Sequence, residues 1–161
     1  MPIFSIIIPT YNQAILLKRC LNSVFQQSFK QYEVIVIDNY SSDNTSKVIK
    51  EFTSKIKYRK FRNHGVIAKS RNIGIKLSLG KWICFLDSDD TWSPEKLEQL
   101  YLIQKNSSID LICNAEWVYK NDKKKLWTYG PDSENFYLKM LSKGNLFSTS
   151  ATSIKKKFLI K

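Results

Sequence analysis

The fold is decided by the stretch Gly80-Lys-Trp-Ile-Cys-Phe-Leu-Asp-Ser-Asp-Asp-Thr-Trp92. Its apolar residues, 82–86, stop abruptly at three carboxylates, Asp87, Asp89 and Asp90. A short apolar run bounded by turn signals predicts a buried strand of a parallel sheet. Acids that follow such a strand are expected where the ligands of open α/β sheets usually bind, at the carboxyl edge of the sheet.

The three clustered carboxylates allow two interpretations. They repel one another unless a cation neutralises them, and carboxylate oxygens suit Mg²⁺ or Mn²⁺, ions that often bridge a protein acid to substrate phosphates. The alternative is an acidic turn before the next helix, because Ser93-Pro94-Glu95 has the character of a helix start with Pro at the first position. The stretch by itself leaves both interpretations open.

The composition is that of one soluble globular domain. The 161 residues are 43% hydrophobic and 13% aromatic, enough for a proper core. No run approaches the roughly 20 apolar residues that a membrane span needs. The start, Met1-Pro2-Ile3-Phe4, has no positively charged region and leads directly into a predicted strand, so we expect no signal peptide. We interpret residues 1–161 as a single domain.

The cysteines favour a cytoplasmic protein. Cys20, Cys84 and Cys113 are widely spaced, and each lies in an apolar context. This arrangement predicts reduced core thiols and gives no sign of a zinc site or a disulfide framework.

The formal charge of +12 favours anionic partners. Lysine dominates it, with clusters at residues 123–125 and 155–157. A protein that binds nucleic acid more typically interleaves arginine and aromatic residues on one element, so we expect no nucleic-acid partner. A basic nucleic-acid-binding protein is a third hypothesis, and a steep salt dependence of DNA or RNA binding would reveal it. Peripheral contact with an anionic membrane, at its inner face, is a further expectation from charge alone.

Strand and helix patterns alternate four times along the chain. This alternation predicts an α/β fold, a Rossmann-like and mostly parallel sheet flanked by helices. Expected helix caps are Asn12 for the first helix, Asp43 or Asn44 for the second and, as the C′ residue of the third, Gly80. The predicted strands are residues 3–8, 33–38, 56–61, 82–86 and 109–113, and the predicted helices run from 13 to 27, 43 to 54, 66 to 79 and 94 to 105.

The pattern beyond the fifth strand is less regular. Residues 116–120 and 125–129 flank Asn121-Asp-Lys-Lys and predict a small β-hairpin. Residues 133–142 resemble a short helix, and 151–154 are strand-like. Three strand ends, at Thr10-Tyr11, Asp38 and Asp87–Asp90, are expected to converge on one crevice. No Gly-x-Gly-x-x-Gly and no Walker loop follows the first strand, which argues against NAD and ordinary ATP sites.

Five motifs in this order resemble the family 2 inverting glycosyltransferases of the GT-A fold. They are Ser5-Ile-Ile-Ile-Pro-Thr-Tyr-Asn12, Val34–Asp38 with Ser41–Thr45, Asn63-His-Gly65, Lys69-Ser-Arg-Asn-Ile-Gly74 and Leu86-Asp-Ser-Asp-Asp90. The resemblance implies a glycosyltransferase that uses a nucleotide-diphospho-sugar donor, most often a UDP-sugar, with Mn²⁺ or Mg²⁺. The implied acceptor is a saccharide or a lipid-linked molecule, as in the synthesis of a polysaccharide or a glycolipid. The implied transfer inverts the configuration at the anomeric carbon of the sugar.

The resemblance also implies the roles of single residues. Asp38 would accept a hydrogen bond from a uracil N–H, and Arg71 would contact the nucleotide, with a surface helix cation as the alternative. Asp87 would accept from ribose or sugar hydroxyls, and Asp89, with Asp90 as alternate ligand or orienter, would hold the metal that offsets charge on the leaving diphosphate. The full set implied for the donor is Pro9, Thr10, Tyr11, Asp38, Arg71, Asp87 and Ser88, with Asp89 and Asp90 for the metal.

The sequence also departs from the family pattern. Many relatives have an acid and then Gly after the second-strand acid, where this chain has Asn39 and Tyr40, so we expect strain there. His64, the one histidine, is expected to have a structural role in the Asn63–Gly65 turn rather than a catalytic role.

The general base that inverting transfer needs is not evident in the sequence. In the family it is a downstream acid, and residues 148–154 resemble the stretch just before it. We therefore expect the base beyond Lys161 in a C-terminally truncated domain. A catalytically silent nucleotide-sugar binder or partner subunit is the alternative.

Overall fold

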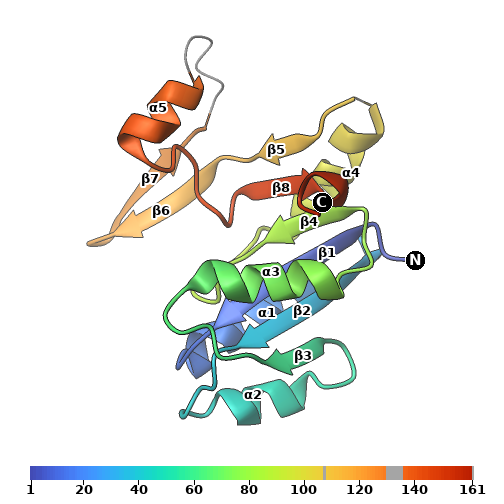
Figure 1. Ribbon diagram of the computed structural model, residues 1–161, viewed down its shortest axis with the longest axis vertical. Helices are drawn as coiled ribbons and strands as arrows, with labels where there is room; N and C mark the ends of the chain where they lie inside the picture. The colour runs from blue at the N-terminus through green and yellow to red at the C-terminus, as the bar shows by residue number, and fades with distance from the viewer. Residues whose placement is uncertain (107, 130–135, 161) are drawn as a thin grey trace.

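A computed structural model describes residues 1–106, 108–129 and 136–160. A six-stranded sheet has the order β3-β2-β1-β4-β8-β5, and β6 and β7 form a separate hairpin (Figure 1). The elements are β1 (Phe4–Thr10), α1 (Ala14–Phe25), β2 (Tyr32–Asp38), α2 (Thr45–Glu51), β3 (Lys57–Lys60), α3 (Ile67–Leu77), β4 (Trp82–Phe85), α4 (Lys96–Asn106), β5 (Leu111–Cys113), β6 (Glu116–Lys120), β7 (Lys123–Trp127), α5 (Phe136–Lys143), β8 (Thr152–Lys155) and the 3₁₀ turn η1 (Lys156–Phe158).

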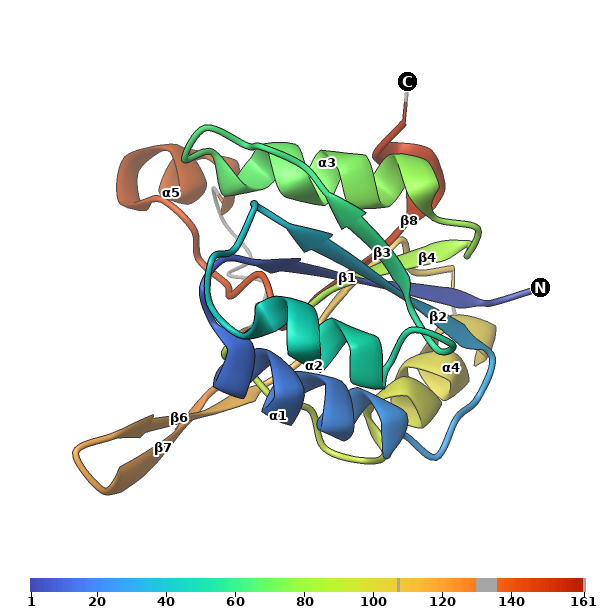
Figure 2. The same ribbon diagram turned by 90° about the horizontal axis from the view of Figure 1, so that it is seen from below.

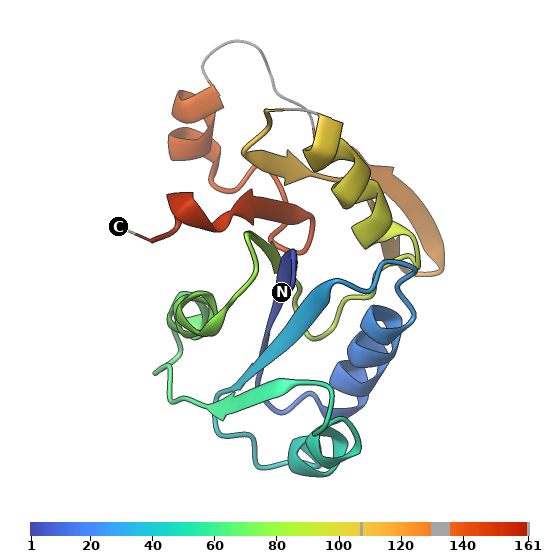
Figure 3. The ribbon, with the colours of Figure 1, turned by 90° about the vertical axis from the view of Figure 1, so that its right-hand side faces the viewer.

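The sheet is mostly parallel and is covered on both faces. β3, β2, β1 and β4 pair in parallel, whereas β8 runs antiparallel to both of its neighbours, β4 and β5. Helices α1, α2 and α4 cover one face and α3 covers the other (Figures 2 and 3). The predicted α/β class and its helix-flanked sheet are confirmed, and β3 lies at a sheet edge as its alternating pattern indicated.

The central strand β1 is buried from end to end because it has helices on both sides. Its residues Phe4, Ile6 and Ile8 belong to the larger core, under α1, α2 and α4. Ile7 points the other way and packs with Ile75 of α3. Such opposed side chains on successive residues are the period-two pattern of a strand, and burial on both faces explains why the run is continuously apolar.

Gly74 allows α3 to lie close against β1. A Cβ atom added at Gly74 would overlap the Cγ2 atom of Ile7. The inner face of α3 is therefore built from its small residues Ser70 and Gly74 together with Ile75, which are its buried positions. Ile67, the first residue of α3, is exposed.

Gly80 is not the C′ residue of α3, which corrects the prediction. The helix ends at Leu77, and Ser78 that follows is extended. Gly80 is required for a different reason: a Cβ there would lie 2.8 Å from the backbone nitrogen of Ser5. The chain crosses β1 at this point before it enters β4, and only a residue without a side chain fits the crossing.

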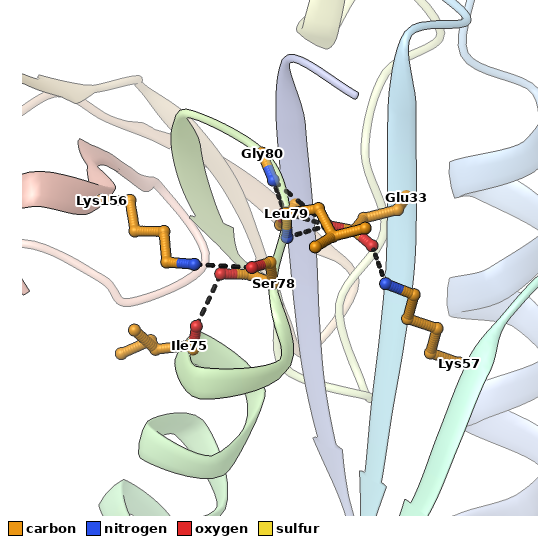
Figure 4. Close-up of polar contacts among 8 residues, drawn as sticks. Glu33, Lys57, Ile75, Ser78, Leu79, Gly80 and Lys156 are labelled. Carbon is orange, nitrogen blue, oxygen red and sulfur yellow. Dashed lines mark hydrogen bonds and ion pairs between the residues drawn. The ribbon is translucent and has the colours of Figure 1, made fainter. Parts of the chain in front are cut away.

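Glu33 ties this crossing to the sheet (Figure 4). Its Oε1 accepts hydrogen bonds from Ser5 Oγ at 2.5 Å and from the Leu79 and Gly80 amides at 2.5 and 3.2 Å. Its Oε2 lies 2.7 Å from the Nζ of Lys57 in β3. Burial opposes ionisation of Glu33, but these donors outweigh it and hold its pKa below the usual value. The carboxylate thus connects three strands and the α3–β4 loop at their amino ends.

The start of α1 depends on a residue far along the chain. Asn12 was predicted as its cap, but Asn12 has φ 50° and its Oδ1 accepts from the Ser42 amide at 2.8 Å. The amide of Ala14 instead donates to Asp43 Oδ2 at 2.9 Å. Asp43 also accepts from the Thr45 amide through Oδ1 at 2.9 Å, so this one carboxylate serves the first turns of both α1 and α2.

The predicted hairpin is present with a tighter turn. Asn121 and Asp122 both have positive φ, 49° and 58°, as a two-residue hairpin turn requires, so β7 begins at Lys123 rather than Lys125. The predicted helix from residue 133 begins partly outside the described residues, and α5 runs from Phe136. The insertion of β8 between β4 and β5 was not predicted, because nothing local in residues 151–154 indicates which strands they join.

The three cysteines are free, as the sequence predicted. Cys20 and Cys84 are buried, and burial raises the pKa of the Cys84 thiol to about 11. Within residues 1–106, 108–129 and 136–160, no helix combines the length and the hydropathy needed to cross a bilayer.

Candidate functional site

A cleft of about 350 Å³ lies beyond the carboxyl ends of β1, β2 and β4. It brings the turn after β1 together with the acidic loop after β4, as the sequence predicted for the strand ends. A hollow of about 870 Å³ lies between α1 and α2, but its lining includes no strand residue and none of residues 87–90. The cleft is lined by Pro9, Thr10, Tyr11, Gln13, Asn39, Asn63, Gly65, Ile67, Asp87, Ser88 and Asp89.

The turn after β1 presents an unused polar atom at this cleft. Thr10 is 5% exposed, and its Oγ1 has no hydrogen-bond partner in the part of the chain that the structure describes. Its carbonyl accepts from the Asn39 amide at 2.9 Å, which holds the two loops together. Tyr11 beside it is more than half exposed. A buried hydroxyl without a partner in the wall of a cleft is what a ligand-binding site offers before its ligand arrives.

Asp38 ends β2 at the expected edge but does not line the cleft. Only 1% of the residue is exposed, and both carboxylate oxygens are engaged. Oδ1 accepts from the amide and hydroxyl of Ser41 at 2.8 and 2.6 Å, and Oδ2 accepts from the Tyr58 hydroxyl at 2.7 Å. Burial and this bond raise the pKa of Tyr58. In this conformation Asp38 supports the loop, and its contact with a base stays a prediction.

The loop after Asp38 adopts the strained geometry that the sequence suggested, and the Asn63–Gly65 turn also has a residue with positive φ. Tyr40 has φ 58°, the left-handed region that favours glycine. The Cζ of Arg62 lies 5.0 Å from the centroid of its ring, a cation–π contact that offsets part of the strain. His64 also has positive φ, 55°, and its neighbour Asn63 accepts from the Gly65 amide at 2.9 Å. His64 thus lies in the Asn63–Gly65 turn, the loop position expected from the sequence.

Arg71 and Asp87 were singled out separately, and the structure pairs them. The Nη2 of Arg71, on α3, lies 2.5 Å from Oδ1 of Asp87. The arginine side chain is 17% exposed, so the alternative of a surface cation is not supported. Its Nε atom is buried and lacks a hydrogen-bond partner among the described residues. A guanidinium with a remaining donor beside a cleft suits an anionic ligand; the nucleotide contact itself stays a prediction.

The acidic loop is held by its backbone, which leaves two carboxylates exposed. The carbonyl of Asp89 accepts from Arg19 Nη2 at 2.5 Å, and the Asp90 amide donates to the Asp87 carbonyl at 3.0 Å. The Ser88 hydroxyl donates a hydrogen bond to Gln13 Oε1. The carboxylate of Asp89 makes no hydrogen bond or ion pair within the described ranges. The loop is thus fixed in position while its acids stay accessible.

The acids fit a divalent cation by their chemistry. Desolvation raises the pKa of Asp90, a hydrogen bond with Ser150 opposes this, and the charges of Asp89, Asp87 and Glu116 raise it further. Mutual repulsion of this kind is relieved by a cation. No group of three metal-ligating side chains converges in the described part of the chain, so two carboxylates would leave the remaining positions to phosphate and water, as Mg²⁺ commonly does.

Ser150 supports the acidic loop and was missed from the sequence. Its Oγ accepts from the Asp87 amide at 3.0 Å. Its carbonyl accepts from Lys96 Nζ at 2.9 Å and from Trp92 Nε1 at 3.4 Å. Burial lowers the pKa of Lys96 to about 8, against the opposing effect of the nearby acids and thiols. The only signal in the sequence was the hydroxyl-rich stretch from 148 to 153, interrupted by Ala151, which does not indicate the partners of these residues.

Glu116 is a second residue whose place the sequence did not reveal. It begins β6 and is partly buried, and its Oε2 accepts from the Tyr129 hydroxyl at 2.7 Å. Burial and this carboxylate raise the pKa of Tyr129 to about 12. The negative charge of Glu116 raises the pKa of Asp90 and opposes the lowering of the pKa of Lys96, so Glu116 belongs to the electrostatic surroundings of the acidic loop.

Curated proteins with related sequences align with about two thirds of this chain or more. The poly(ribitol-phosphate) β-N-acetylglucosaminyltransferase TarP of Staphylococcus aureus is 39% identical over 113 residues, 67% of this chain and 35% of its own length. The Escherichia coli enzyme WfgD, a UDP-Glc:α-D-GlcNAc-diphosphoundecaprenol β-1,3-glucosyltransferase, is 37% identical over 119 residues, 73% of this chain and 47% of its own length. The chain therefore spans less than half the length of these relatives.

Solved structures show the same fold over nearly the whole chain. S. aureus TarS 1–349 in complex with UDP has a TM-score of 0.80 at 23% identity, covering 99% of this chain and 48% of that one. The mannosyltransferase PcManGT of Pyrobaculum calidifontis, in complex with GDP-Man and Mn²⁺, has a TM-score of 0.72 at 17% identity, covering 98% and 46%. The profile of Glycosyl transferase family 2 matches residues 5–158. The chain belongs to glycosyltransferase family 2, and its fold is of the GT-A type.

Proposed function

We propose that this chain binds a nucleotide-diphospho-sugar, a UDP-sugar, in the cleft at the carboxyl edge of the sheet, for transfer of the sugar to a polymer or lipid-linked acceptor. The observation that carries the proposal is a cleft lined by unused polar groups: Thr10 Oγ1 lacks a partner among the described residues, and the exposed Asp89 lines the same cleft. Arg71 pairs with Asp87, a third residue of this lining. TarP and WfgD are glycosyltransferases by name, and TarS binds UDP.

The proposed roles follow from position. Pro9, Thr10 and Tyr11 form the wall that would receive the nucleoside, since all three line the cleft at the end of β1. Arg71 would place positive charge near the diphosphate, because its guanidinium already faces the acidic loop at Asp87. Asp87 would accept from a hydroxyl of the ribose or sugar through the oxygen that Arg71 leaves unpaired, with Ser88 alongside.

Asp89 and Asp90 would hold Mn²⁺ or Mg²⁺. The metal, when bound, would neutralise charge on the leaving diphosphate. Transfer with inversion would form the bond from the acceptor oxygen to the anomeric carbon as the bond to the diphosphate oxygen breaks, and the proton of the acceptor hydroxyl would pass to a general base. In this step the chain's own residues would orient the donor and place charges around it. Arg71 holds the Asp87 carboxylate, and Arg19 holds the backbone carbonyl of Asp89.

Titration calorimetry with UDP, in the presence and absence of Mn²⁺, tests the donor site. Asp89→Ala should abolish the metal-dependent part of the binding and leave the fold intact, because the substitution removes an exposed, repelling charge. Glu51→Ala is the matched control, since this exposed acid pairs with Lys18 of α1 and does not line the cleft. Metal-dependent heat that is unchanged in Asp89→Ala would refute the assignment. Measured transfer or hydrolysis of a UDP-sugar would separate an active enzyme from a silent binder.

A further inference from the structure

Lys96 carries a charge in a place that is unfavourable for it. It is the first residue of α4, on the face of the sheet that α1 also covers (Figures 2 and 3). Among the lysines and arginines whose burial the structure describes, only Lys96 is buried, with 9% of its surface exposed. Removing an ammonium group from water is costly, and the positive end of the helix dipole at the start of α4 adds to the cost. A charge retained where the fold gains little from it is a sign of a role in function.

The ammonium group of Lys96 joins two segments that are distant in the chain. Its Nζ donates to the carbonyl of Ser150, in the turn before β8, at 2.9 Å. The same Nζ lies 4.2 Å from the centroid of the Trp92 ring, which follows the acidic loop. Trp92 Nε1 also donates to the Ser150 carbonyl, at 3.4 Å, across 58 residues of sequence. Lys96 and the indole ring therefore meet at one acceptor atom and at each other.

Both residues that Lys96 contacts hold the acidic loop. Ser150 Oγ accepts from the Asp87 amide at 3.0 Å, where the loop begins, and the same hydroxyl bonds the Asp90 carboxylate. Trp92 lies directly after the loop, where its backbone continues toward α4. A displacement of either Ser150 or Trp92 would therefore move an end of the loop, and the ammonium group of Lys96 restrains both.

The surroundings of Lys96 come from four elements. The charged or titratable groups that act on it are Asp90 of the acidic loop, Glu116 of β6 and the thiols of Cys84 in β4 and Cys113 in β5. Burial raises the pKa of both thiols, so they are neutral at neutral pH. The two carboxylates favour the charged form of Lys96 and offset part of the cost of its burial.

We infer that Lys96 is a positioning residue of the donor site: it holds Ser150 and Trp92 so that the acidic loop keeps the geometry that a nucleotide diphosphate and its metal ion require. The ligand in this inference rests on the proposed function, whereas the ordering of the loop does not. A role in stability alone fits less well. An apolar side chain of similar length would fill the same space without the cost of burying a charge.

Lys96→Met tests the inference, because methionine keeps the apolar stem and removes the ammonium group. In the full chain without ligand, hydrogen exchange of the backbone amides of residues 87–92 should become about tenfold faster, since a hydrogen bond from a charged donor is lost, while the amides of β1 exchange as in the wild type. The urea midpoint should stay the same or rise. Calorimetry should show metal-dependent UDP binding weakened about tenfold. Lys105→Met, at an exposed lysine in the last turn of the same helix, is the control and should change none of these.

Three results would overturn the inference. Exchange of residues 87–92 at the wild-type rate would show that Lys96 does not order the loop. Faster exchange with wild-type UDP binding would show that this order does not matter to the site. A lower urea midpoint, or a variant that does not fold, would assign Lys96 to the stability of the fold. If the wild type itself binds no UDP, the proposed donor site fails, and the exchange rates alone decide whether Lys96 positions the loop.

Discussion

Ser150→Ala removes the hydroxyl that joins the turn before β8 to the acidic loop. In the wild type, Ser150 Oγ accepts from the Asp87 amide at 3.0 Å, and Ser150 itself is 3% exposed. Alanine leaves this amide without its acceptor. The same hydroxyl bonds the Asp90 carboxylate, so the variant also loses a donor that favours ionised Asp90. The Ser150 carbonyl, with its bonds from Lys96 and Trp92, is retained.

The magnitude follows from these two bonds. An amide left unsatisfied in a buried place costs about 1–3 kcal/mol, and Asp87 is one-third exposed at its side chain, so water recovers part of the loss. We expect about 1–2 kcal/mol less free energy of unfolding, measured by urea denaturation at neutral pH. The larger consequence is expected in ligand binding, because a loosened loop must be ordered again when UDP and Mn²⁺ bind. Calorimetry should show metal-dependent UDP binding weakened about tenfold, a difference of roughly 1.4 kcal/mol.

The control for this prediction is Ser142→Ala. The Ser142 hydroxyl is exposed and bonds the Lys139 carbonyl within α5, so its loss should change neither quantity. Wild-type stability together with wild-type UDP binding in Ser150→Ala would refute the assignment of Ser150 as a support of the acidic loop. A loss of stability with unchanged binding would show that Ser150 is structural only, so the two measurements together separate a positioning role from a packing role.

Three further outcomes follow from the fold. Gly74→Ala should lower the free energy of unfolding by about 1–2 kcal/mol, because the clash with Ile7 outweighs the better helix propensity of alanine; an unchanged urea midpoint would contradict the close approach. The pKa of Glu33 is lowered from an ordinary 4.5, so its stabilising effect is full above that pH and is lost as the pH falls below it. Glu33→Gln should therefore be less stable than the wild type at pH 7, and the urea midpoints of the two proteins should converge in acid. Midpoints that stay apart in acid would contradict this prediction. A thiol reagent should modify Cys113 before Cys20, because Cys20 is fully buried and burial raises its pKa; faster modification of Cys20 would show the core to be open.

The parts of the fold that sequence predicted are those set by local pattern. Continuous apolar runs such as Ile6–Ile8 require burial on both faces of a sheet, and that requirement places strands and helices in alternation. The convergence of Thr10 with the acids after β4 follows as well, since the carboxyl ends of parallel neighbours share one edge. Part of the cleft lining was therefore accessible from the pattern of strand ends, namely Pro9, Thr10, Tyr11, Asp87, Ser88 and Asp89. The other lining residues, Gln13, Asn39, Asn63, Gly65 and Ile67, were not in the predicted binding set.

The parts that sequence did not predict depend on partners far away in the chain. Gly80 had the spacing of a helix end, but its role is set by contact with Ser5, 75 residues earlier. Asn12 had the chemistry of a cap, but the α1 amide is satisfied by Asp43. The hydrogen bond that Asp38 accepts from Tyr58 of β3 was not predicted either, whereas the contact of Asp38 with a base stays a prediction. In each case the residue type was informative, and the competing partner decided the geometry.

The acidic loop is fixed from both layers of the molecule, which explains why no single motif builds the site. Arg19 reaches the Asp89 carbonyl from α1 on one face of the sheet, and Arg71 reaches the Asp87 carboxylate from α3 on the other. Ser150 adds a third support from the turn before β8. The β8 strand is antiparallel and lies between two strands that precede it in the chain, so the loop reaches its final support only after the C-terminal part has folded into the sheet. The donor half and the region beyond β5 are therefore coupled at Asp87–Asp90, and a change in either is expected to alter how these acids meet a ligand.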